Sequence, residues 1–194
     1  MYKLCKTEQS ASRQHQLENG LLAAMGTQRY EEISVSDLCE QMQIPRKSFY
    51  RYFSSKDGAL HAMLDHTLLE YHERQAQRVI RDSLHETRAE LEIFFSFWLG
   101  KKTLLDALER SGLSGILVER AISQAGTEFH YLSPARRDDP EAVRDHAASF
   151  VITGLMSMVI KWHHLGYRQS VSEMAQIASS LLTRPLIMPG EQLL

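Results

Sequence analysis

The sequence predicts an all-α protein of about nine helices, and three observations support this prediction. Apolar residues recur at spacings of three and four along most of the 194-residue chain. Residues that cap or open helices, such as Ser34, Pro140 and Ser170, stand just before these repeats. Alternating apolar and polar runs, the usual sign of strands, are missing from the sequence. We therefore expect an N-terminal three-helix domain over residues 1–56 and a larger helical bundle over residues 57–194.

The first two helices are predicted from their apolar faces and one cap. A helix over about residues 13–25 carries Leu17, Leu21, Leu22 and Met25 on one face. The next helix is predicted to begin at Ser34, whose hydroxyl can cap it, with Asp37 completing a capping box. Its buried face holds Val35, Leu38, Cys39 and Met42.

A tight turn at Ile44 is predicted to lead into a third helix, and the three helices together predict a helix–turn–helix. Pro45 suits the first position of a helix that runs to about Tyr52, because proline lacks an N–H that the first turn leaves unpaired. Phe49 and Phe53 lie four apart and can face inward. The side chains that this turns toward solvent or a DNA groove are Arg46, Lys47, Ser48, Tyr50 and Arg51.

Positive charge is concentrated on this third helix. Residues 46–56 carry four cations and no acidic residue, whereas the formal net charge of the whole chain is −2. Phosphate neutralisation is a local event, so a near-neutral chain can still bind DNA. The alternative is that these cations only solubilise a helical bundle.

The same stretch resembles the N-terminal domain of the TetR family of bacterial transcriptional regulators. Its helix–turn–helix ends in a Tyr-x-His/Tyr-Phe-x-x-Lys run, here residues 50–56, and begins with Val-x-Asp-Leu, here residues 35–38. The resemblance covers residues 13–65. It implies that DNA phosphates are contacted by Ser34, Tyr50, Tyr52 and Lys56. It also implies that base edges are faced by Arg46, Lys47 and Ser48.

Three residues depart from the family's pattern. Gln43 stands where the turn usually has glycine, Pro45 where a small polar residue is usual, and Lys47 where glycine is frequent. A positive φ at Gln43 would cost roughly 1 kcal/mol. These departures leave open a second interpretation, a helical protein-interaction module whose DNA-reading head is altered or lost.

The larger bundle is predicted to begin with a long helix over about residues 56–80. Its inward residues are Leu60, Leu64, Leu68 and Tyr71. Three further helices are indicated by apolar spacing. The first carries Leu91, Phe94, Phe95, Trp98 and Leu99, and the second carries Leu104, Leu105 and Leu108. The third runs from about Leu113 to Phe129 and carries Ile116, Leu117 and Val118.

Two last helices are predicted over residues 140–165 and 170–184. Asp139, Pro140 and Glu141 open the first, and Ser170 with Glu173 caps the second. The first has a wide apolar face made of Phe150, Val151, Leu155, Met158, Val159 and Trp162. The second is expected to face inward with Met174, Ile177, Leu181 and Leu182.

In TetR-like regulators the last two long helices pair with those of a second copy, so the resemblance implies a homodimer. The open alternative is that the apolar face of residues 140–165 is only intrachain core. The segments 162–166 and 170–175 also resemble a subgroup that includes activators of dihydroxyacetone-kinase operons. Activation therefore stays open beside repression.

A small-molecule effector, where one exists, is expected to bind inside the bundle among apolar and aromatic side chains. The candidate pocket residues are Phe94, Phe95, Phe97, Trp98, Met158 and Trp162. Each of them alone fits a core position better than a pocket wall.

Other classes of function lack their motifs in this sequence. The pairs His61/His66 and His163/His164 do not have metal-ligand spacing on one helix face, so no metal is expected. Neither a catalytic residue nor a cofactor is expected. Two cysteines, no leader and no apolar run of membrane-spanning length predict a cytoplasmic protein without a membrane partner.

The sequence as a whole predicts a sequence-specific transcriptional regulator. We expect a repressor that binds a palindromic operator in double-stranded DNA as a homodimer. A small-molecule effector is expected as a further partner.

Overall fold

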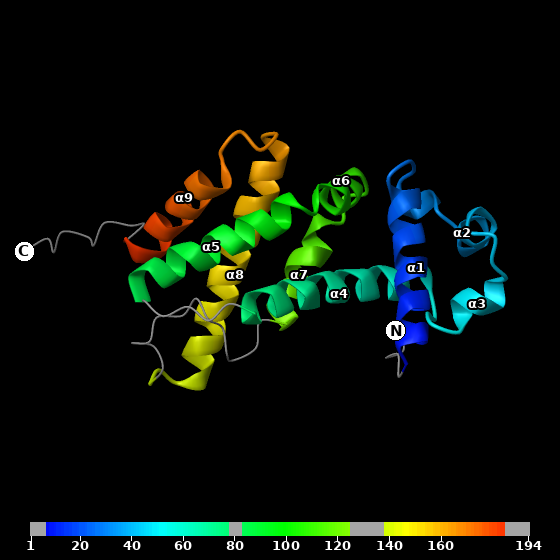
Figure 1. The fold of residues 1–194 in the computed structure, drawn as a ribbon, viewed down its shortest axis with the longest axis horizontal. Helices are drawn as coiled ribbons and strands as arrows, with labels where there is room; N and C mark the ends of the chain where they lie inside the picture. The colour runs from blue at the N-terminus through cyan, green and yellow to red at the C-terminus, as the bar shows by residue number, and fades with distance from the viewer. Residues whose placement is uncertain (1–6, 78–82, 125–137, 185–194) are drawn as a thin grey trace, which may run out of the picture. The chain divides into compact units, whose positions relative to one another are not determined.

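The chain folds into helices throughout the residues that the structure describes. This computed structural model describes residues 7–77, 83–124 and 138–184. Within these ranges the regular elements are nine α-helices and one short 3-10 helix, η1 (Figure 1). In chain order they are α1 (Glu8–Met25), η1 (Tyr30–Glu32), α2 (Val35–Gln41), α3 (Arg46–Tyr50), α4 (Lys56–Ala76), α5 (Ser83–Leu99), α6 (Lys102–Arg110), α7 (Ser114–Gln124), α8 (Glu141–His164) and α9 (Val171–Thr183). The predicted all-α fold is confirmed.

Helix starts follow the predicted caps in two cases and depart from them in two. Ser34 accepts a hydrogen bond from the N–H of Asp37, and Ser170 forms a reciprocal capping box with Glu173. Pro45 and Pro140, by contrast, lie one residue before their helices, with extended ψ angles of 140° and 145°. The third helix also ends at Tyr50 rather than Tyr52. The predicted ends of two further helices, at Ile80 and Phe129, lie outside the described residues.

The chain divides into two compact units whose boundaries differ from the predicted division at residue 56. The first unit contains residues 1–73 and 101–124, and the second contains residues 74–100 and 125–194. The first therefore includes α6 and α7 as well as the predicted DNA-binding segment. A functional division at residue 56 stays a prediction, since compactness alone does not test it.

The first unit is held together by an apolar core and by an ion pair between α4 and α7 whose carboxylate is buried. Its largest fully buried side chains are Leu17, Leu21, Met25, Leu38, Phe49, Phe53 and Leu60. The side chain of Met42 packs on the bare backbone of Gly20, where a Cβ would lie 2.3 Å from the methionine sulfur. Asp65 of α4 accepts hydrogen bonds from Arg120 and Gln124, which ties α7 to α4. The carboxylate is 6 % exposed, so loss of its partners would be costly.

The second unit has an aromatic core between α5 and α8, and α9 packs along α5 (Figure 1). Phe95 meets Trp162 edge to face with ring centroids 5.8 Å apart. Trp162 in turn packs against Tyr167 at 5.0 Å and donates its indole N–H to the carbonyl of Gln169. Trp162 therefore helps to anchor the turn after α8 to the core.

Helix α8 has one packed apolar face and, opposite it, an outer stripe of mixed residues, whereas the sequence suggested a single wide apolar face. One face packs inside the unit through Ala148, Ile152, Leu155, Met156, Val159 and Trp162. On the opposite side, residues spaced by three and four form a stripe made of Val143, Ala147, Phe150, Gly154, Ser157, Lys161 and Leu165. Phe150 was predicted to share a face with Leu155 and Trp162, yet it lies on this outer stripe and is 71 % exposed.

Candidate nucleic-acid interface

The helix–turn–helix is anchored from behind by aromatic side chains. Phe49 of α3 and Phe53 just after it are 0 % and 1 % exposed, with ring centroids 5.4 Å apart. Leu38 and Cys39 of α2 are equally buried. Burial raises the pKa of the Cys39 thiol, which keeps it neutral at physiological pH. The inward prediction for Phe49 and Phe53 is confirmed, and α3 is fixed on one side only.

The turn between α2 and α3 ends α2 with a left-handed residue. The N–H of Ile44 donates to the carbonyl of Cys39 and that of Gln43 to the carbonyl of Glu40, the pattern of a Schellman motif. The same pair of bonds ends α6 and α8, where Gly112 and Gly166 occupy the left-handed position with φ of 68° and 67°. Gln43 occupies it in α2 with φ of 54°. Gln43 therefore has the positive φ that carries a strain for a residue other than glycine.

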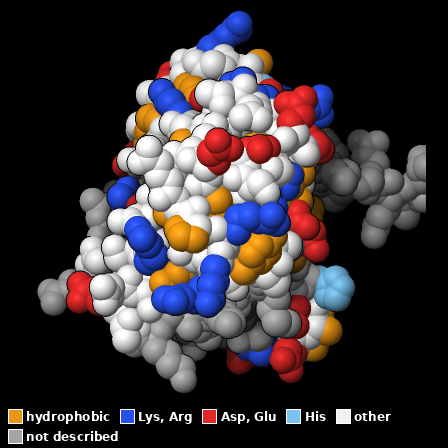
Figure 2. All heavy atoms as spheres, turned by 90° about the vertical axis from the view of Figure 1, so that its right-hand side faces the viewer, with side chains coloured by type: hydrophobic (Ala, Val, Ile, Leu, Met, Phe, Trp, Pro, Cys, Tyr) orange, Lys and Arg blue, Asp and Glu red, His pale blue; other side chains and the backbone are white. Residues whose placement is uncertain are grey.

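The face of α3 that points away from the core is cationic. Arg46, Lys47 and Arg51 are exposed, and Ser48 is half-buried. Tyr50 is 45 % exposed, and the guanidinium of Arg46 lies 6.0 Å from the centre of its ring. Figure 2 shows lysine and arginine side chains gathered around hydrophobic ones on the side of the molecule where Figure 1 draws α2 and α3. This surface, defined by Arg46, Lys47, Tyr50 and Arg51, is called the cationic face below.

Two of the predicted phosphate contacts are already used inside the protein. The hydroxyl of Ser34 donates to Asp37 at 2.6 Å while it accepts from the N–H of the same residue. The ammonium of Lys56 donates to the carbonyls of Tyr30 and Ile33, at 2.5 and 2.7 Å, and lies 4.2 Å from the centre of the Tyr30 ring. An ammonium has three donors, so one N–H of Lys56 is left for a phosphate. Tyr52 is half-buried.

Tyr30 connects the helix–turn–helix to the end of α6. The sequence did not predict this contact. Its N–H donates to the hydroxyl of Ser111 at 3.0 Å, and its phenol donates to Asp57 at 2.6 Å. Burial, followed by the hydrogen bond to the Asp57 carboxylate, raises the pKa of Tyr30 well above its usual range. Tyr30 and Ser111 are 81 positions apart, and no local pattern marks such a pair. Tyr30, Ser111 and Asp57 therefore help to position the helix–turn–helix.

The predicted pocket residues are gathered as core. Phe94, Phe95, Phe97, Trp98 and Trp162 are at most 2 % exposed, and Met158 is half-buried. A cavity of about 450 Å³ in the same unit is lined instead by Arg74, Glu92, Ile93, Ser96 and Val171. The indole N–H of Trp98 is buried and has no hydrogen-bond partner among the described residues. Trp98 is therefore the predicted pocket residue whose polar group lacks a hydrogen-bond partner among the described residues.

Comparison with known proteins identifies the fold. No family model and no curated protein matches the chain. Among solved structures, the chain is similar to the fatty acid degradation regulator FadR from Bacillus halodurans, with a TM-score of 0.62 and 13 % sequence identity. The match covers 94 % of this chain and 98 % of the FadR chain. At this identity the likeness shows that the two proteins share an all-helical fold.

Proposed function

We propose that this protein is a sequence-specific DNA-binding transcriptional regulator of the TetR type, acting in the cytoplasm. The observation that carries the proposal is the cationic face, because it projects from a helix whose other side is fixed by Phe49 and Phe53. A short rigid helix with exposed arginines is what major-groove reading requires. FadR, which has the same fold, is a regulator by its printed description.

The proposed division of labour on DNA assigns base edges to Arg46, Lys47 and Ser48. Arginine can bind the O6 and N7 atoms of guanine bidentately, which discriminates between bases. Tyr50, Arg51 and Tyr52 are assigned to phosphates. Ser34 and Lys56 are also assigned to phosphates. They would contact them with the hydrogen-bonding positions that their internal bonds leave unused.

We further propose that the protein acts as a homodimer through α8 and α9. The outer stripe of α8 exposes Phe150, and α9 exposes Ile177 and Leu181, which are four residues apart and 43 % and 42 % exposed. A Cβ added at Gly154, in the middle of the stripe, would meet nothing within 4 Å in the chain. A large exposed phenylalanine beside a bare backbone fits an interface in which a second helix approaches closely.

A lipid bilayer is the competing occupant of this stripe. By length and composition alone, α8 is long and apolar enough to cross a membrane. Glu141, Arg144, Asp145 and Lys161 lie on the same helix, and charged side chains are costly in a bilayer core. We therefore favour a second copy of the chain.

The bundle is also the proposed site of a small-molecule effector. Trp98 would be its polar anchor, because a ligand acceptor facing the indole N–H would satisfy a donor that has no partner among the described residues. Binding there would act on DNA affinity only by favouring one of two conformations. We propose repression as the regulatory outcome, with activation as the alternative.

The experiment that tests the proposed function is selection of bound duplexes from a random DNA pool, at two salt concentrations, with the mass of the bound protein recorded. We expect an enriched palindrome bound by two chains, with affinity falling steeply as salt rises. A variant with Arg46→Glu and Lys47→Glu should enrich nothing. Arg110→Glu reverses an exposed charge at the end of α6, which is not part of the cationic face, and should leave the palindrome unchanged.

Failure to enrich any sequence, by a folded dimer, would contradict the proposal and favour the protein-interaction module. Equal enrichment by the double variant would show that α3 does not read the DNA.

A further inference from the structure

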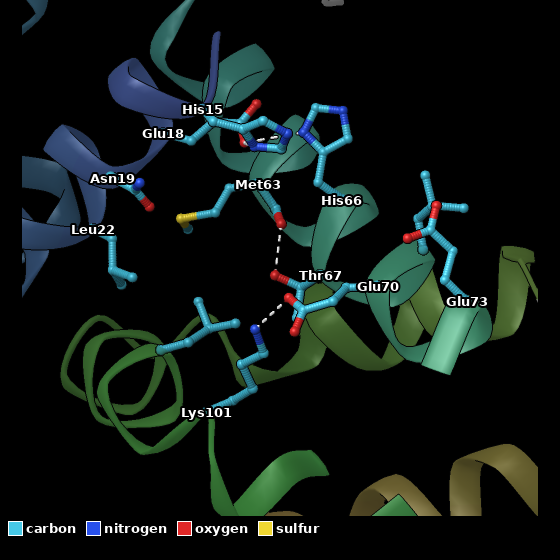
Figure 3. A pocket seen from close by; sticks show the side chains of 12 residues that line it. His15, Glu18, Asn19, Leu22, Met63, His66, Thr67, Glu70, Glu73 and Lys101 are labelled. Carbon is cyan, nitrogen blue, oxygen red and sulfur yellow. Dashed lines mark hydrogen bonds and ion pairs between the residues drawn. The ribbon is translucent and has the colours of Figure 1, made fainter. Parts of the chain in front are cut away.

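Three metal-ligating side chains converge at one point in the first unit. His15 and Glu18 are three residues apart on α1, and His66 comes from α4. One carboxylate oxygen of Glu18 lies 3.1 Å from Nδ1 of His15 and 3.0 Å from Nδ1 of His66. Figure 3 shows both imidazole rings turned toward Glu18. The three potential ligand atoms all lie within 4.8 Å of one another.

Glu18 is an unusual residue to find at this depth. It is 3 % exposed, and its second carboxylate oxygen has no hydrogen-bond partner among the described residues. Burial of a carboxylate is costly unless its charge is compensated. Neutral imidazoles compensate it only in part. A cation held beside the two histidines would supply the rest of the compensation.

The cluster opens onto a cavity of about 400 Å³ whose wall is acidic. Glu18, Glu70 and Glu73 line it, and the lining residues include a single lysine, Lys101, which is paired with Glu70 at 2.5 Å (Figure 3). The surroundings of the cluster therefore attract a cation and leave space beside it for further ligands such as water.

We propose that His15, Glu18 and His66 bind a divalent transition-metal ion such as Zn²⁺. Two imidazole nitrogens and one carboxylate oxygen are a common ligand set for zinc in proteins. Ligands at about 2.0–2.1 Å from a tetrahedral ion are about 3.3 Å apart, close to the separations from Glu18 to each histidine. The third separation, between the two histidine nitrogens, is within 4.8 Å, so binding requires the two rings to move no more than slightly closer together. The cavity beside the cluster leaves room for water as a fourth ligand.

An ion bound here joins α1 to α4. The two helices contribute ligands 51 positions apart in the chain, between His15 and His66. Metal binding to the folded protein alone stabilises it by mass action, so the first unit should unfold at higher temperature when Zn²⁺ is present. This inference does not rest on the proposed function, because it concerns ion binding and stability only.

The test is a titration of the untagged, metal-free, full-length protein with Zn²⁺, followed by calorimetry and by thermal unfolding. We expect one ion per chain and a rise in the unfolding temperature. His15→Ala is the informative variant, because the His15 side chain is 53 % exposed and its loss leaves the core intact. It should weaken binding at least tenfold. His66→Ala and Glu18→Gln should do the same.

His61→Ala is the matched control. His61 also lies on α4, five residues before His66, and does not belong to the cluster. Its replacement should leave zinc affinity within twofold of the original. A Co²⁺-loaded protein provides a second readout, because its visible absorption depends on the ligand set and should change with His15→Ala but not with His61→Ala.

Two results would overturn the proposal. One is the absence of stoichiometric Zn²⁺ binding by the metal-free protein, which would show that the imidazoles serve only as hydrogen-bond partners of Glu18. The other is equal weakening by His15→Ala and His61→Ala, which would mean that zinc binds elsewhere on the surface.

Discussion

The cationic face of α3 and the outer stripe of α8 are both exposed, but they differ in what they could bind. The first carries Arg46, Lys47 and Arg51 on a five-residue helix. The second carries Phe150 and Gly154 on a 24-residue helix. Charge on a short helix suits the groove of a polyanion, whereas an apolar stripe on a long helix suits a second apolar surface. Exposure alone therefore does not define a partner, since the chemistry of the exposed face decides.

Charge reversal on α3 should have the largest effect. Arg46→Glu with Lys47→Glu replaces two proposed base contacts in each chain of the proposed dimer by repulsive ones, so affinity for the operator should fall by about 1,000-fold or more. The molecular mass should not change. Fluorescence anisotropy with the selected duplex measures the affinity, and sedimentation equilibrium measures the mass. A dimer that dissociates in this variant would show that the two faces are not independent.

Phe150→Asp should change the molecular mass first and DNA binding only through it. It places a charge in the middle of the outer stripe, and the symmetry of the proposed dimer places it there twice, so the dimer should dissociate about 100-fold more readily. Operator binding should weaken as a consequence, because a single head makes few base contacts. Sedimentation equilibrium over a range of concentrations measures the effect.

Gly154→Ala tests the outer stripe of α8 by the direction of its effect, since it can either stabilise the helix or weaken the dimer. In an isolated helix the change stabilises by about 1 kcal/mol, because alanine is the better helix former. If a partner helix packs closely on Gly154, the methyl group instead weakens the dimer. Increased thermal stability with unchanged dimerisation would place the interface away from this residue.

Lys56 and Lys47 should differ in how much each stabilises the fold. Lys56→Met removes the donor to the carbonyls of Tyr30 and Ile33, and the free energy of unfolding should fall by about 1.5–3 kcal/mol. Lys47→Met removes an exposed charge, and stability should change by less than about 0.5 kcal/mol. Urea unfolding measures both. Similar losses in the two variants would mean that Lys56 does not hold η1 to the start of α4.

The smallest expected effect is at the turn. Gln43→Gly removes the penalty of a left-handed residue, and the folded head should gain up to about 1 kcal/mol. DNA preference should stay the same, because the Schellman bonds that end α2 involve only the backbone. The change is measured as a shift in the urea midpoint at constant slope. A loss of stability would indicate that the Gln43 side chain contributes more than its backbone costs.

Local patterns predicted the helices of this protein well, because caps and apolar spacing act over a few residues. Ser34, Ser170, Phe49 and Phe53 all lie where those rules put them. The rules could not separate the two faces of α8, since Phe150 and Leu155 are both apolar and only the packed structure decides which of them is covered.

Long-range contacts were beyond such rules. The internal role of Lys56 depends on carbonyls 23 and 26 positions away. The histidine spacings that were considered did not include His15 with Glu18, three residues apart on one face of α1. That pair was visible in the sequence, but its third member, His66, becomes a neighbour only when α1 packs on α4.

Tyr30 limits how this protein could be recombined with another. Its N–H, carbonyl and phenol are each bonded to a different partner, namely Ser111, Lys56 and Asp57. A chimera that exchanges residues 1–56 alone would separate Tyr30 from Ser111 and from Asp57. An engineer who wishes to graft a new DNA-reading head would have to move the exchange point past Asp57 and supply a hydroxyl at position 111. The portable segment is thus longer than the segment that would touch DNA.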